Sequence, residues 1–129
     1  MKQYILAVDF DGTIVKTEDD YVPRSLMPNV KTVLDWARDK GCYIIIWTCR
    51  SGKMLKQAID FLDKQKIPYD AVNKNHPKVD FETSRKIFAS YYIDDRSFDI
   101  DWLKIKQKIQ KELVANLAKE IKKTEKDNV

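Results

Sequence analysis

The chain has 129 residues, of which 43% are apolar and 34% are charged, and its net charge is +4. This length is small for two domains, and the composition predicts one soluble globular domain with much helix. No apolar run approaches the roughly 20 residues of a membrane span, and the N-terminus lacks a secretion signal. We therefore expect a cytoplasmic protein that has no membrane partner.

The positive charge is concentrated near the C-terminus. Residues 1–102 carry sixteen basic and sixteen acidic side chains, whereas residues 103–129 carry eight Lys and four acids. A nucleic-acid footprint combines such charge with Arg and aromatic side chains, and this segment has neither. We expect no nucleic-acid partner and interpret the charge as a solvated helix face.

The predicted elements alternate between strands and helices along the chain. Continuous apolar runs predict buried strands, and apolar residues at helical spacing predict helices. The predicted strands are 4–9, 42–47, 69–72 and 90–94. The predicted helices are 29–40, with Asn29 as N-cap, 54–66, about one turn at 84–89, and a long amphipathic helix at about 98–125 whose last residues, 122–129, fray.

Two cysteines, Cys42 and Cys49, bracket the second predicted strand. On an extended strand their separation is roughly 20 Å, which is too far for a disulfide. We expect both to be buried free thiols, as suits a reducing compartment.

Strands that alternate with helices imply a Rossmann-like α/β domain, with a parallel sheet flanked by helices. In such sheets ligands bind at the carboxyl ends of the strands. Acidic and hydroxyl side chains follow three of these ends. They are Asp9 and Asp11 after the first strand, Thr48 after the second, and Asp94 and Asp95 after the fourth.

These side chains favour phosphate chemistry. Several carboxylates in one place cannot all ionise unless a cation lies among them, and Mg²⁺ prefers a few carboxylates together with waters and phosphate oxygens. An Asp can attack phosphorus, and a second acid two residues on lies on the same side of an extended strand, where it can move the proton. Gly12 allows a tight turn of the backbone beside the phosphate.

The sequence resembles the haloacid dehalogenase-like (HAD) superfamily of phosphohydrolases. The four motifs of that family appear in order as "VDFDGT" (8–13), "IIIWT" (44–48), Lys86 in "SRKIF", and "YYIDD" (91–95). The resemblance covers residues 4 to about 100 and is strongest to the small, capless bacterial and phage hydrolases.

The resemblance implies a role for each motif. Asp9 would be the nucleophile, Asp11 the general acid and base, Thr48 a ligand of the phosphoryl oxygens, and Lys86 the cation that neutralises the aspartyl phosphate. Mg²⁺ would bind Asp9, the backbone carbonyl of Asp11, and Asp94, with Asp95 beside it or bound through water. Nearby Arg85, Lys74 or Lys78 is an alternative to Lys86.

Substrate recognition is less clearly marked. Arg50 and Arg96 each follow a strand end and are candidate substrate contacts, with a solvated loop charge as the alternative for each. No gap between motifs can hold an independent cap domain. Loops 16–24 and 73–83 are therefore candidate specificity elements, and the long C-terminal helix is a candidate surface for a homo-oligomer.

We thus expect a Mg²⁺-dependent phosphatase that acts on a phosphorylated small molecule or a phosphorylated macromolecule. Two alternatives stay open. One is a protein that binds a phosphorylated ligand or a partner with little turnover. The other is a receiver-like signalling module, although that family carries its acceptor Asp after the third strand, where this chain has Val72 and Asn73.

Overall fold

The computed structural model of this protein describes residues 3–97 and 99–127. Strands and helices alternate along the chain, except that the fourth strand follows the third with no helix between them. In chain order the elements are β1 (Ile5–Val8), α1 (Val30–Asp39), β2 (Tyr43–Ile46), α2 (Gly52–Lys64), β3 (Ala71–Val72), β4 (Tyr91–Ile93) and α3 (Trp102–Asp127).

The four strands form one parallel sheet in the order β3-β2-β1-β4. Strand β1 is central, and its last residue, Val8, pairs with Ile46 on β2 and with Ile93 on β4. Because all strands run in the same direction, the residues that follow these three meet at one edge of the sheet. This confirms the predicted fold class.

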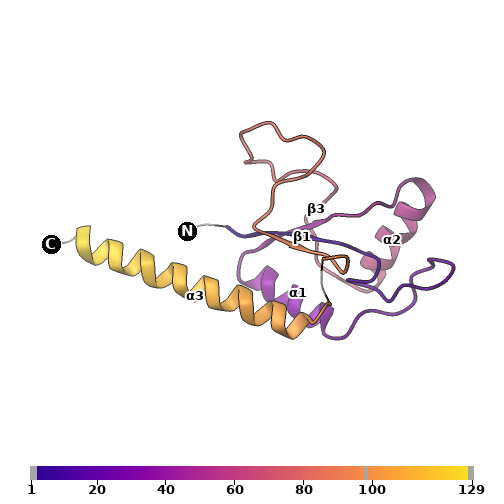
Figure 1. The fold of residues 1–129 in the computed structure, drawn as a ribbon, viewed down its shortest axis with the longest axis horizontal. Helices are drawn as coiled ribbons and strands as arrows, with labels where there is room; N and C mark the ends of the chain where they lie inside the picture. Colours follow the sequence, from indigo (N-terminus) through magenta and orange to yellow (C-terminus); the bar gives the residue numbers. More distant parts are fainter. Residues whose placement is uncertain (1–2, 98, 128–129) are drawn as a thin grey trace.

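Alternation along β1 divides the core between the two faces of the sheet. Leu6 and Val8 pack with apolar side chains of α1, α2 and α3. Ile5 and Ala7 point to the opposite face, where Ile87 and Ala89 cover them. Figure 1 shows α1 and α3 side by side on one side of the sheet and the β3–β4 connection on the other.

The predicted helical turn at 84–89 is wrong. This segment has no helical residue, and its burial alternates, with Ile87 4% exposed, Phe88 45% and Ala89 8%. A period of two suits an extended segment that lies against a sheet rather than a helix. The segment therefore covers the second face of the sheet with irregular chain.

Helix α3 begins later and ends later than the prediction. The Asp101 carboxylate accepts hydrogen bonds from the backbone N–H groups of Leu103 and Lys104, at 3.1 and 3.2 Å, and so caps the helix at that point. Residue 98, where the prediction started, lies outside the described residues. The helix continues to Asp127 and so includes most of the segment for which the sequence predicts fraying; the fraying itself stays a prediction.

Two smaller predictions need adjustment. Asn29 occupies the N-cap of α1, but its side chain makes no capping hydrogen bond and its backbone is left-handed, with φ of 66°. Cys42 is buried, whereas Cys49 is exposed, so the prediction of two buried thiols is wrong for Cys49. Both cysteines are free, as predicted.

No cap domain interrupts the fold. Between β1 and α1 the described chain has isolated bridges but no helix or strand, and the β3–β4 connection has neither. None of the helices in the described ranges combines the length and the apolar character that crossing a membrane requires.

Trp102 links α3 to the chain that follows β1. Its indole N–H donates a buried hydrogen bond to the backbone carbonyl of Thr13 at 2.9 Å, and its side chain is 2% exposed. Trp102→Phe leaves that carbonyl without its donor, so we expect the free energy of unfolding to fall by about 2 kcal/mol in urea denaturation. Trp36→Phe, the same change at a partly buried Trp of α1, is the control. Equal losses for both variants would contradict a special contribution from this bond.

Candidate active site

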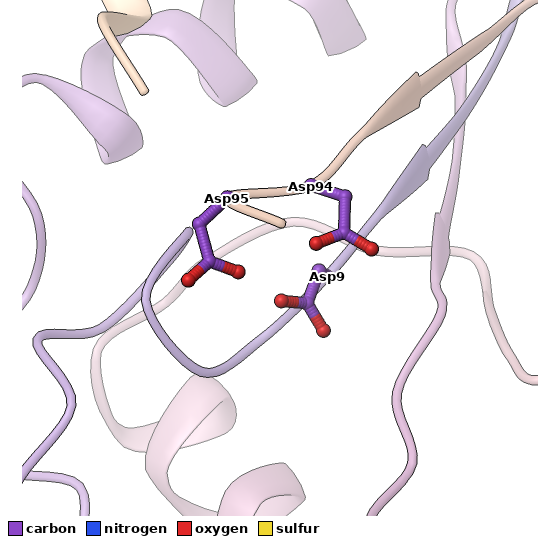
Figure 2. A group of neighbouring side chains, drawn as sticks. All are labelled: Asp9, Asp94 and Asp95. Atoms are coloured by element: carbon purple, nitrogen blue, oxygen red, sulfur yellow. The ribbon is translucent and has the colours of Figure 1, made fainter. Parts of the chain in front are cut away.

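Three carboxylates meet where β1 and β4 end. One oxygen from each of Asp9, Asp94 and Asp95 lies within 4.8 Å of the other two. Figure 2 shows the three side chains converging from the ends of the two neighbouring strands. The β1–β4 register explains this meeting, because the Asp9 backbone N–H donates to the carbonyl of Ile93 at 2.9 Å.

The buried hydroxyl of Thr13 holds the two sides of the cluster together. It donates to the Asp9 carboxylate at 3.4 Å and accepts from the backbone N–H of Asp95 at 3.0 Å. Thr13 is fully buried, so water does not compete for these bonds. The sequence placed Thr13 within the first motif but gave it no role of its own.

Gly12 lies against the same cluster. Its φ is +76°, and a Cβ at this position would lie 2.8 Å from Cγ of Asp95. A larger residue would therefore be strained and would push the Asp95 carboxylate away. The sequence predicts a tight backbone turn at Gly12, and the positive φ agrees with this; in this structure the neighbour that leaves no room for a Cβ is Asp95.

The surroundings of Asp9 disfavour its charge. Burial raises its pKa to about 7, and the nearby charge of Asp94 and a hydrogen bond with Asp95 act in the same direction. Like charges that cannot separate are stabilised by a proton or by a cation. Three hard oxygen donors on one side of a site fit Mg²⁺, which binds through a few carboxylates and keeps several waters. Asp9, Asp94 and Asp95 are therefore the residues that would hold it.

Asp11 is not one of the clustered carboxylates. The chain leaves the extended conformation after Asp9, and the N–H groups of Thr13, Ile14 and Val15 all bond to the Phe10 carbonyl. The Asp11 carboxylate instead forms a two-pronged ion pair with Arg50, with N–O distances of 2.8 and 2.9 Å. The two-residue spacing therefore does not place both side chains on one side of a strand.

Arg50 connects three segments around Asp11. Its guanidinium also donates to the carbonyls of Tyr21 and Met54, and its Cζ lies 5.0 Å from the centre of the Phe10 ring. The Arg50 side chain is only 4% exposed, so it is not the solvated loop charge considered as an alternative. Loop 16–24 is thereby docked beside the site.

A hollow of about 250 Å³ opens next to this ion pair. It lies between loop 16–24 and the start of α2. Its lining residues are Asp11, Tyr21, Cys49, Arg50, Ser51 and Met54. The exposed side chains of Tyr21 and Met54 give it an apolar surface beside the Asp11 carboxylate.

Thr48 is held in place by Asn73. The Asn73 side chain accepts the Thr48 backbone N–H at 2.9 Å and donates to the Thr48 carbonyl at 3.0 Å. The Thr48 hydroxyl accepts the N–H of Arg50 at 3.1 Å, which leaves its own O–H as a donor. The sequence prediction missed Asn73, and its position directly after the third strand was the available signal.

Lys86 and Arg96 are both exposed. The Lys86 ammonium lies 4.5 Å from the centre of the Tyr92 ring. The Tyr92 hydroxyl donates to the Ile87 carbonyl at 2.7 Å, so Lys86 lies over the face of the sheet that Ile87 and Ala89 cover. Among the described residues Lys86 forms no ion pair with the three clustered acids. The Arg96 backbone N–H donates to the Asp94 carboxylate at 2.8 Å.

The fold and this site define an α/β protein whose parallel strands end in a cluster of carboxylates. No protein-family model matches the chain, and no curated protein matches it either. Among solved structures, a conserved protein from Bacteroides thetaiotaomicron is 30% identical, with a TM-score of 0.76. The match covers 86% of this chain and 93% of that protein. This chain belongs to the same family as that conserved protein.

Mg²⁺ should stabilise this protein, and the gain should depend on pH. The pKa of Asp9 is about 7, against an ordinary value of 3.8. Without metal, protonation of Asp9 stabilises the folded state increasingly as the pH falls from about 7 towards 3.8. Because the proton and the cation compete, the rise in melting temperature on adding Mg²⁺ should be largest above that pKa and should shrink below it.

Single substitutions test which carboxylates cause the rise in melting temperature on adding Mg²⁺. Asp9→Asn and Asp94→Asn should each remove most of the Mg²⁺-induced rise, and Asp39→Asn, at an exposed acid of α1, should keep it. A rise of the same size in all three variants would place the cation elsewhere.

The Arg50–Asp11 pair should also matter for stability. Arg50→Ala leaves a partly buried carboxylate without its partner, and we expect the free energy of unfolding to fall by about 3 kcal/mol. The control is Arg24→Ala, which breaks a similarly two-pronged pair with Asp20 on the exposed surface. Urea denaturation measures the free energy of unfolding of both variants, and Arg24→Ala should change it little. An equal loss of stability in the two variants would contradict the argument that burial makes the Arg50–Asp11 pair the more important one.

Proposed function

We propose that this protein is a Mg²⁺-dependent phosphatase that hydrolyses phosphate monoesters through an aspartyl phosphate on Asp9. The observation that carries the proposal is the cluster of Asp9, Asp94 and Asp95 at the carboxyl edge of a parallel sheet. The motif order in the sequence supports the same chemistry, as does the resemblance to HAD phosphohydrolases.

The reaction has two steps. In the first, a carboxylate oxygen of Asp9 bonds to phosphorus while the ester P–O bond breaks, and protonated Asp11 gives its proton to the leaving oxygen. In the second, water attacks phosphorus, Asp11 takes the proton, and the bond between Asp9 and phosphorus breaks. The products are the free alcohol and inorganic phosphate, and both acids return to their starting forms.

Other residues bind and position these groups. The free O–H of Thr48 is a donor for a phosphoryl oxygen, and Lys86 is the candidate cation from the second face of the sheet. The hollow beside Asp11 is the candidate space for the leaving group. Bound Mg²⁺ would neutralise the clustered carboxylates and polarise the phosphoryl oxygens.

One observation favours the alternative of a phospho-ligand-binding protein with little turnover. The Asp11 carboxylate is engaged by a buried Arg50, and it must leave or loosen that pair to exchange a proton with a substrate. In this alternative Arg50 keeps Asp11 fixed, and a bound phosphate stays intact.

A phosphatase screen separates the two functions. With Mg²⁺ and a panel of phosphate monoesters, the wild type should release inorganic phosphate, Asp9→Asn should fall to background, and Asp11→Asn should lose about 10²–10⁴-fold in kcat. Asp39→Asn should keep full activity as the matched change at an exposed acid.

Binding of inorganic phosphate, measured by calorimetry, completes the comparison. Phosphate binding without hydrolysis of any ester would establish the low-turnover alternative. Hydrolysis that is unchanged in Asp9→Asn would contradict the proposed nucleophile.

A further inference from the structure

Helix α3 extends past the part of the domain that it covers. Trp102 and Ile109 pack in the core, and the Asn116 side chain donates a hydrogen bond to the Tyr4 hydroxyl. The helix continues to Asp127, and Figure 1 shows its C-terminal part projecting beyond α1 and the sheet. A helix that leaves the domain body has faces that the body does not bury.

An apolar row lies on such a face. Val114, Leu117 and Ile121 are 63%, 47% and 50% exposed. Their spacing of three and four residues aligns them along one side of the helix, as in a coiled-coil seam. We call the full row the outer stripe; it consists of Leu103, Gln107, Gln110, Val114, Leu117 and Ile121.

Charged residues beside the outer stripe change sign along the helix. Its first half is flanked by basic side chains and its second half by acidic ones. The basic residues are Lys104, Lys106 and Lys111, and the acidic residues are Glu120, Glu125 and Asp127. Such a row is complementary to a copy of itself that runs in the opposite direction.

We propose that a second copy of this chain binds the outer stripe, with the two α3 helices antiparallel. In one register Val114 lies against the partner's Leu117, and Ile121 lies against the partner's Gln110. Each contact occurs twice by symmetry. The interface is therefore isologous and closes as a dimer.

The same register pairs the charges. Lys104 faces the partner's Glu125, and Lys106 faces the partner's Asp127, again twice each. A parallel arrangement instead places Lys106 beside the partner's Lys111, and Glu120 beside the partner's Glu125, which is repulsive. The charge pattern therefore favours the antiparallel dimer. This proposal does not depend on the proposed phosphatase activity.

Charge-swap variants of the full chain test this dimer by sedimentation equilibrium. The first is Lys104→Glu with Lys106→Glu, and the second is Glu125→Lys with Asp127→Lys. Each alone turns four attractive contacts into repulsive ones, so the dimer dissociation constant should rise about tenfold or more. An equal mixture of the two variants restores opposite charges at every contact, and its dissociation constant should return to near the wild-type value.

The control is Lys122→Glu with Lys123→Glu, which makes the same charge change off the outer stripe and should leave the dimer intact. Leu117→Lys should make the chain monomeric with unchanged helix content by circular dichroism. A wild type that is monomeric throughout a dilution series would overturn the proposal. Swap variants that dimerise as well as the wild type, or more tightly, would overturn it too, because they indicate another interface or a parallel one.

Discussion

The parallel pairing of β1 with β4 is the constraint on which the site depends. It joins segments 85 residues apart, since Val8 pairs with Ile93, and so Asp9 emerges beside Asp94. Burial already disfavours the charged form of Asp9, and the neighbouring carboxylates of Asp94 and Asp95 disfavour it further. The strand order thus brings together the three carboxylates that would hold a cation.

Two further links keep this edge of the sheet in one arrangement. Thr13 bonds the Asp9 carboxylate to the Asp95 backbone, and Trp102 bonds to the Thr13 carbonyl from the first turn of α3. On the other side, Arg50 ties Asp11 to loop 16–24 and to α2. Thr13 and Trp102 therefore position the clustered carboxylates, and Arg50 positions Asp11.

The sequence predicted the strand ends well because buried apolar runs that stop at Asp9, Thr48 and Asp94 are local signals. It could not predict that Arg50 would be buried and paired with Asp11. The two residues are 39 positions apart, and their pairing depends on how the chain turns after Phe10. The helical turn at 84–89 failed for a related reason. Contact of Ile87 and Ala89 with the sheet outweighed the local helical pattern. The start of α3 was missed although its signal, the capping Asp101, was local.

Mass spectrometry can detect the proposed transfer of the phosphoryl group to Asp9. The reaction with an aryl phosphate and Mg²⁺ would be quenched with acid during turnover, and the protein would then be digested. We expect the peptide that contains Asp9 to carry the added mass of one phosphoryl group, which hydroxylamine removes because an acyl phosphate is labile to it. Turnover with an unmodified Asp9 peptide, or with the phosphoryl group on another residue, would rule out Asp9 as the nucleophile.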